Sequence, residues 1–195
     1  MSNRFASTAA ALLLVAGCQS TPPADQAQAS ADAAVDKKSL ALFDGALDAI
    51  HAEHYTDAEK LLKELTQRDP KLSGPWVNLG SVYAALGDDK AAEAAYKQAI
   101  EVNPNSCPAY VELGIMARRA GDFLTAEADY LACTQRVPDF REAYLNLGIL
   151  YELYLGRLSD ALKAYQTYQA LSKDQDRRVA GWVADLERRL AGNES

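Results

Sequence analysis

Cysteine and histidine are the residue types in this chain best suited to metal binding or covalent chemistry. The 195-residue sequence contains three cysteines and two histidines, which are Cys18, Cys107, Cys133, His51 and His54. Helical spacing would place both histidines of HAEHYTD on one side with Asp57 nearby, a weak metal-binding pattern. That stretch crosses a predicted turn between helices, where polar side chains are simply solvated, so we predict no metal site.

Motifs of the common catalytic sites are absent from the sequence. It contains no G-x-S-x-G, no Walker loop, no H-E-x-x-H and no C-x-x-C. The neighbouring carboxylates Asp88 and Asp89, and also Asp122, occupy turn positions that favour helix caps. We therefore predict that the chain is not an enzyme, and that it takes no cofactor and no small-molecule substrate.

The charge of the chain argues against nucleic-acid binding. Its formal net charge is −7, and its basic residues form no block longer than pairs such as Arg118-Arg119. A nucleic-acid binder needs a concentrated positive surface to displace counterions from the phosphates. We expect protein partners and a membrane contact instead.

Residues 1–17 have the layout of a secretory signal peptide. Arg4 and the amino terminus carry positive charge, and residues 5–16 carry none and end in LLLVA. This run is too short to span a bilayer as a helix. Small residues then lead directly into Cys18.

Val15-Ala16-Gly17-Cys18 resembles the lipobox of bacterial lipoproteins. The resemblance implies that a signal peptidase cuts before Cys18 and that lipid is attached to its sulfur and its new amino group. Several acyl chains would give stable anchoring, which a single chain does not. An aspartate after the cysteine resembles an inner-membrane retention signal in Gram-negative lipoproteins, so Gln19 favours the outer membrane.

The segment after the cysteine, QSTPPADQAQASADAAVDKK, contains two prolines and one large apolar residue, Val35. It buries too little apolar surface to offset the entropy of ordering it. We interpret residues 18–38 as the lipidated cysteine and a flexible tether.

The rest of the chain is periodic. In the segment 74–104 the first predicted helix carries Trp76, Leu79, Gly80 and Tyr83 on one face, and a Gly-Asp-Asp break follows. Ala92, Tyr96 and Ala99 mark one face of a second helix, which ends at Asn103-Pro104. The same pattern recurs at a period of about 34 residues and resembles the tetratricopeptide repeat.

Four such repeats are predicted, over residues 39–72, 73–106, 107–140 and 141–173. The first lacks the Trp and Gly positions, as expected of an end repeat. One repeat cannot bury its apolar face alone, so we predict an all-α, right-handed α-solenoid of four helix pairs. Residues 174–195 form a final helix and tail. The apolar stripe of this helix, which includes Trp182, either caps the last repeat or docks a partner, and we favour the cap.

Cys107 opens the first helix of the third repeat, and Cys133 lies near the end of the antiparallel second helix. Antiparallel packing brings these two helix ends together, and the predicted compartment is oxidising. Two interpretations remain open. The pair forms a disulfide, or Cys133 replaces a small core residue and Cys107 is a surface thiol.

In the tetratricopeptide repeat family the first helices line a concave groove that binds a peptide of the partner. The resemblance places the following residues in that groove: Phe43, Asp44, Leu47, Val77, Asn78, Ser81, Val111, Glu112, Ile115, Arg118, Arg119, Leu145, Asn146, Ile149 and Glu152. Asn78 and Asn146 match a groove asparagine that bonds peptide backbone in several relatives, since an amide offers both donor and acceptor. Asp44 and Glu112 interrupt that ladder. Arg118 and Arg119 either meet an acidic partner or are ordinary solvated charges.

These features predict a non-catalytic adaptor held by lipid on the periplasmic face of the outer membrane. The combination resembles the pilotin lipoproteins of type IV pili, which help secretins assemble, and related lipoproteins of Tad pilus systems. Two other roles remain open. The adaptor recruits peptidoglycan hydrolases or synthases, or it serves a TonB-like envelope machine.

Overall fold

The computed structural model describes residues 36–172 and 176–192. The chain divides into two units, Met1–Val35 and Asp36–Ser195, and the described residues all belong to the second. The predicted signal peptide, Cys18 and most of the predicted tether lie outside the described residues.

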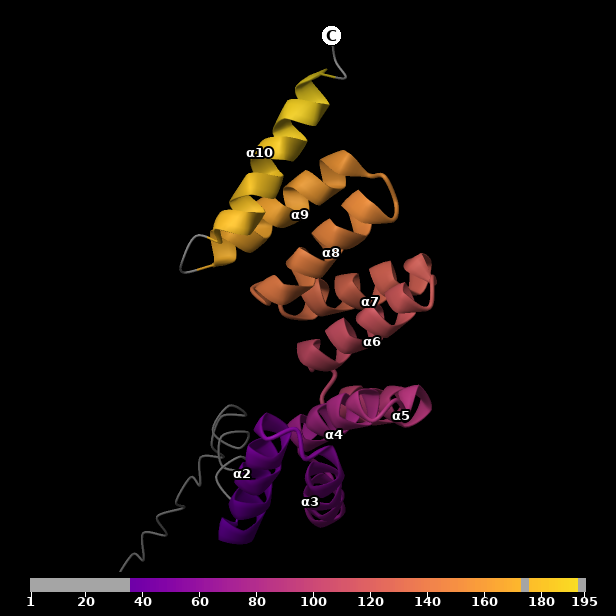
Figure 1. The fold of residues 1–195 in the computed structure, drawn as a ribbon, viewed down its shortest axis with the longest axis vertical. Coiled ribbons are helices and arrows are strands. Elements are labelled where there is room, and N and C mark those ends of the chain that lie inside the picture. The colour runs from indigo at the N-terminus through magenta and orange to yellow at the C-terminus, as the bar shows by residue number, and fades with distance from the viewer. Residues whose placement is uncertain (1–35, 173–175, 193–195) are drawn as a thin grey trace, which may run out of the picture. The chain divides into compact units, whose positions relative to one another are not determined.

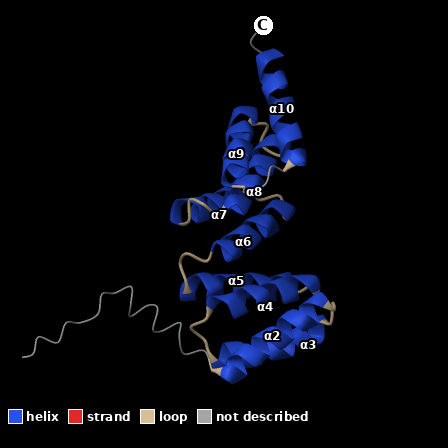
Figure 2. Ribbon diagram, turned by 90° about the vertical axis from the view of Figure 1, so that its left-hand side faces the viewer, coloured by secondary structure: helices blue, strands red, loops and turns tan. Residues whose placement is uncertain are grey.

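The described residues form α-helices joined by short loops, and none of them forms a strand. The helices are α2 (Lys37–His51), α3 (Tyr55–Arg68), α4 (Ser73–Ala85), α5 (Asp89–Val102), α6 (Cys107–Arg119), α7 (Phe123–Arg136), α8 (Arg141–Leu153), α9 (Leu158–Leu171) and α10 (Arg177–Gly192). The first eight form four pairs that follow one another through the structure, with α10 at the C-terminal end (Figure 1). The view turned by 90° shows the same helices, with loops between them and no strand in the part of the chain that the structure describes (Figure 2). The prediction of an all-α solenoid of helix pairs is confirmed.

Helix α2 begins at Lys37, two residues before the predicted start of the first repeat. The carboxylate of Asp36 accepts a hydrogen bond from the backbone N–H of Ser39 at 2.8 Å and so caps the helix. The same carboxylate pairs with the guanidinium of Arg68 at the end of α3. This hydrogen bond from Arg68 is the main reason that the pKa of Asp36 falls to about 2. Residues 36–38, which the sequence assigned to the tether, thus belong to the folded unit.

Aspartates start two of the second helices, as predicted. Asp88 accepts the N–H of Ala91 at 3.0 Å, and Asp122 accepts the N–H of Thr125 at 3.1 Å. The residues before them, Gly87 and Gly121, have φ angles of 80° and 81°, in the left-handed region that favours glycine. In the first repeat Glu53 takes the corresponding place, with a φ of 58°. The degraded end repeat therefore keeps the backbone turn without the glycine.

The periodic glycines allow the two helices of a pair to approach closely. A Cβ atom at Gly80 would lie 2.5 Å from the ring of Tyr96, and the same clash arises between Gly114 and Tyr130 and between Gly148 and Tyr165. The three tyrosine rings are almost completely buried. Each glycine therefore makes room for the aromatic ring that fills the core of its own repeat.

We expect Gly148→Ala to lower the free energy of unfolding by about 2 kcal/mol, because the added methyl group overpacks the buried ring of Tyr165. Gly181→Ala is the matched control. Gly181 lies within α10, and a Cβ there would meet nothing within 4 Å. Removing this exposed helical glycine should stabilise the chain by about 1 kcal/mol. Urea unfolding of both variants tests the packing, and equal effects of the two substitutions would contradict it.

Helix α10 packs on α9 and covers the last repeat. Val179 and Leu186 are buried in the same core cluster as the third and fourth repeats. Trp182 contacts the ring of Tyr165, with ring centroids 5.4 Å apart, and remains 38% exposed. Arg189 pairs with Glu152 of α8 at 3.0 Å. The contacts of α10 are those of a cap.

Candidate functional site

The residues predicted to line the groove lie on the first helices of consecutive pairs, α2, α4, α6 and α8. Helix α4 contacts α6, and α6 contacts α8, so the surfaces of these three helices are neighbours. Val111 is only 7% exposed and belongs to the core cluster, so it packs beneath the groove surface and does not line it. Ile115, Leu145 and Ile149 are half-buried and pack against the same cluster.

Four polar residues recur at one position of the first helices: Asp44, Asn78, Glu112 and Asn146. The Nδ2 atom of Asn78 donates to the carbonyl of Gly74 at 3.2 Å, and that of Asn146 donates to Glu142 at 2.9 Å. One N–H of each amide is thus used within its own helix, while the Oδ1 atoms accept no hydrogen bond from the described residues. Together with the carboxylates of Asp44 and Glu112, they present a row of acceptor oxygens.

Glu112 occupies the centre of this row and is half-buried. Burial raises the pKa of its carboxyl group above the ordinary value. No described residue donates a hydrogen bond to it. A partly desolvated carboxylate of this kind is well placed to accept an N–H or a cationic group from a bound partner.

Two buried tyrosines of the second helices hold groove residues in place. Tyr96 Oη donates to Ser81 Oγ at 3.2 Å, and Tyr165 Oη donates to Glu152 Oε2 at 3.1 Å. Burial raises the pKa of Tyr96 to about 12, so its hydroxyl remains a donor at neutral pH. In the second and fourth repeats the core is thereby connected to the groove side chains.

Arg118 is engaged within the fold. Its Nη1 atom lies 3.3 Å from Tyr154 Oη, and its guanidinium lies over the ring of Tyr154, 5.6 Å from the centroid. The side chain is half-buried against this ring, so Arg118 is not an ordinary solvated charge. Its contact with an acidic partner stays a prediction. Arg119, the next residue, is exposed.

Cys107 and Cys133 are joined by a disulfide in the structure, with their Cα atoms 4.9 Å apart. Both residues are buried, at 2% and 0% exposed, so Cys107 is not a surface thiol. The bond ties the start of α6 to the end of α7 and closes the third helix pair at its open end.

His51, His54 and Asp57 gather no further ligands. Within residues 36–172 and 176–192, no three His, Cys, Asp or Glu side chains form a group that could hold a metal ion. His51 and His54 are both exposed, at the end of α2 and just before α3. None of the described helices has the length and apolar character needed to cross a membrane.

Comparison with known protein families matches two segments of the chain, residues 49–114 and 111–189, to the tetratricopeptide repeat. Together the two matches cover most of the described helices. The chain belongs to the tetratricopeptide repeat family. Members of this family bind protein partners and are generally non-catalytic interaction modules, and this chain is a scaffold for protein–protein interaction.

Solved structures of tetratricopeptide repeat proteins share the fold. PilF of Pseudomonas aeruginosa matches with a TM-score of 0.70 and 19% identity, over 80% of this chain and 71% of PilF. TTC0263 of Thermus thermophilus matches with a TM-score of 0.65 and 24% identity, over 82% and 86% of the two chains. MamA of Desulfovibrio magneticus RS-1 matches with a TM-score of 0.63 and 19% identity, over 81% and 88%. A comparison with curated protein sequences finds no match.

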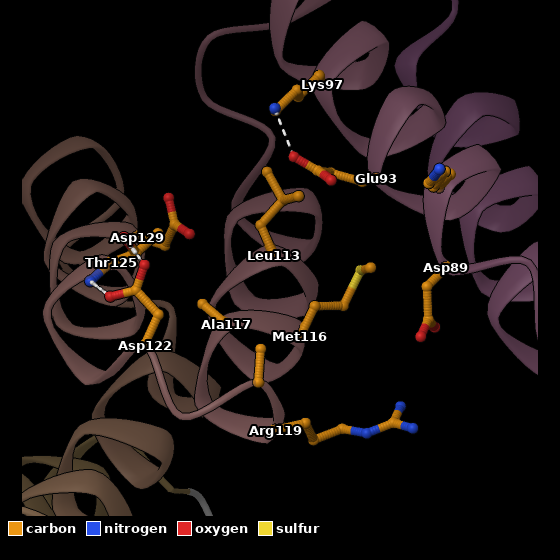
Figure 3. A pocket seen from close by; sticks show the side chains of 12 residues that line it. Asp89, Glu93, Lys97, Leu113, Met116, Ala117, Arg119, Asp122, Thr125 and Asp129 are labelled. Carbon is orange, nitrogen blue, oxygen red and sulfur yellow. Dashed lines mark hydrogen bonds and ion pairs between the residues drawn. The ribbon is translucent and has the colours of Figure 1, made fainter.

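The tetratricopeptide repeats also form a pocket that sequence reasoning missed. It has a volume of about 590 Å³ and is lined by α5, α6 and the start of α7. Leu113, Met116 and Ala117 of α6 lie at its centre in Figure 3. The sequence feature that could have indicated the pocket is Ala117. The second and fourth repeats have the larger residues Tyr83 and Tyr151 at this position.

Proposed function

We propose that this chain is a lipid-anchored adaptor on the periplasmic face of the outer membrane, where it holds an extended segment of a partner protein and helps an envelope complex assemble. The observation that carries the binding mode is the row of acceptor oxygens on α2, α4, α6 and α8. An extended peptide presents backbone N–H groups at regular intervals, and such donors complement this row. The charges of Asp44 and Glu112 favour a partner segment that also carries Lys or Arg.

The lipid anchor rests on Cys18 and the residues before it. Val15-Ala16-Gly17-Cys18 follows a positive start and an apolar run in the order that lipoprotein processing requires. Gln19 supports the outer membrane as the destination. A tether of about twenty residues would let the repeats reach a partner beyond the lipid headgroups.

A secretin of a pilus system is the partner class that we favour. The support is the fold similarity to PilF together with the resemblance of the chain to pilotin lipoproteins, which join a lipobox to tetratricopeptide repeats. In this role the repeats would bind the secretin subunit while the lipid keeps the complex at the membrane in which the secretin assembles. The chain would act without catalysis.

The test is a crosslinked pull-down from intact envelopes that compares the wild type with the double variant Asn78→Ala/Asn146→Ala. Loss of two amide acceptors should weaken binding of the partner about thirtyfold, since each net hydrogen bond contributes about 1 kcal/mol. Gln67→Ala/Gln135→Ala removes two exposed amides from the second helices α3 and α7 and should leave recovery unchanged. Equal recovery with all three proteins would disprove the proposed binding of the partner in the groove. Recovery of no secretin would disprove the proposed role in secretin assembly.

A further inference from the structure

The pocket between α5 and α6 is open to solvent, and its lining includes Arg119, one of the residues predicted to line the groove. Figure 3 shows Leu113, Met116 and Ala117 projecting from α6, Glu93 and Lys97 from α5, and Asp122 and Asp129 on the far side. The base of the pocket is therefore apolar and its rim is charged. A flexible methionine at the base suits a binding surface because it adapts its shape to a ligand.

The repeats on either side show what is missing from this pocket. Where α3 meets α4, Tyr55 and Tyr83 pack against the first core cluster. Where α7 meets α8, Phe123 and Tyr151 occupy the same two positions and pack into the next cluster. Where α5 meets α6, these positions are Asp89 and Ala117. The junction therefore lacks two aromatic rings, and both of these residues line the pocket.

The charged groups that accompany the aromatic ring elsewhere are still present. In α3, Glu59 pairs with Lys63, and the ammonium of Lys63 lies 5.6 Å from the ring centroid of Tyr83. In α5, Glu93 and Lys97 occupy the same two positions and form the same ion pair, at 2.5 Å. Among the residues that line the pocket, none supplies an aromatic ring between that pair and α6.

The fourth repeat shows how the hydroxyl of such a tyrosine is bound. Tyr151 Oη donates to Glu127 Oε1 at 2.8 Å, and Glu127 lies on α7 at the position that Glu93 holds on α5. A phenol ring placed above Ala117 would therefore find both an acceptor for its hydroxyl, in Glu93, and a cation for its face, in Lys97.

We propose that this pocket binds a tyrosine side chain of a partner protein, with the ring above Ala117 between α5 and α6 and the hydroxyl donating to Glu93. The inserted ring restores the aromatic layer that the neighbouring junctions build from their own residues. The inference rests on the proposed function as a protein-binding adaptor and adds a second, side-chain-specific contact to it.

The charges around the pocket favour a neutral hydrogen-bond donor over an anion. Carboxylates of Asp89, Glu93, Asp122 and Asp129 outnumber the cations of Lys90, Lys97 and Arg119. Asp129 is half-buried, and this burial raises its pKa to about 6. A phosphate or carboxylate ligand would face these groups at a cost, whereas a phenol brings no charge and supplies a proton to an acceptor.

Titration of the 15N-labelled full chain with N-acetyl-tyrosinamide tests the proposal. We expect saturable NMR shifts of the amides of Leu113, Met116 and Ala117 in the wild type. Ala117→Tyr fills the pocket from within and should abolish them. Ala128→Tyr places the same ring on an exposed site of α7 and should leave them intact. Glu93→Ala should weaken binding about fivefold, as expected for one lost hydrogen bond.

Three results would overturn the proposal. They are equal shifts with N-acetyl-leucinamide, unchanged binding by Ala117→Tyr, and unchanged affinity of Glu93→Ala. The Glu93 variant keeps the test decisive even if Ala117→Tyr folds poorly, because Glu93 is exposed and its removal leaves the core intact. The assay uses the purified chain alone, so its failure is distinguishable from a failure of partner capture in envelopes.

Discussion

Cys18→Ser is expected to abolish acylation and processing and to remove the protein from the outer-membrane fraction. Serine has no thiol to carry the diacylglyceryl group, and the resemblance to lipoproteins implies a peptidase that cuts only before a lipidated cysteine. The effect is all-or-none, because each buried methylene of an acyl chain contributes about 0.8 kcal/mol to membrane binding and several chains are lost together. Membrane fractionation and the intact mass of the purified protein measure it.

Gln19→Ser is the matched control for this variant. It changes the adjacent residue and leaves Cys18 in place, so the protein should still begin at residue 18, carry lipid and remain in the outer membrane. The repeats of the Cys18→Ser variant should show an unchanged far-ultraviolet circular dichroism spectrum, since residue 18 precedes the folded unit that starts at Asp36. If the serine variant is still cleaved and still membrane-bound, the lipoprotein interpretation is wrong.

Cys107→Ala/Cys133→Ala is expected to lower the free energy of unfolding by about 3.5 kcal/mol. The disulfide closes a loop with a sequence separation of 26, and the value is the loop entropy that such a crosslink removes from the unfolded chain. In a folded unit of this size, a loss of that magnitude lowers the melting temperature by about 10 °C. Calorimetry of both proteins measures the difference.

Reduction of the wild type provides the control for the cysteine variants. With a reductant present the wild type should melt near the double alanine variant, whereas the variant should not respond to the reductant. Protein purified from the cell envelope should take up thiol-reactive label at Cys107 and Cys133 only after reduction, since the proposed compartment is oxidising. Labelling of both thiols without reduction would show that the bond is absent from the native protein.

The helix pairs were predictable because their determinants are local and recur. Gly80, Gly114 and Gly148 mark the close approach of two helices wherever a tyrosine follows on the second helix. Asp88 and Asp122 cap helices through bonds to residues three positions away. The start of α2 was placed two residues too late, because the cap of Asp36 is reinforced by Arg68, a distant residue that helical periodicity does not reveal.

The candidate site was predictable only in part. The acceptor row could be found from the sequence, since Asn78, Glu112 and Asn146 recur with the repeat. The burial and the contacts of each groove side chain could not be predicted from the sequence. Arg118 lies on the ring of Tyr154, in the loop after α8, and Val111 is buried beneath the groove. Both outcomes depend on how one repeat packs on the next.

The sequence by itself determined the repeat, its family and the order of the helix pairs, because these follow from spacing within one helix or between two successive helices. It also carries the lipobox prediction, a linear motif that needs no folded context. The tertiary structure decided which contacts join residues far apart in the chain. It brought the buried sulfurs of Cys107 and Cys133 together, and it showed that Asp89 and Ala117 line the same pocket. The pocket lies where two helices pack together and both have a non-aromatic residue at positions that carry aromatic rings in the neighbouring repeats. Only the packing of the helices brings those two positions to the same pocket.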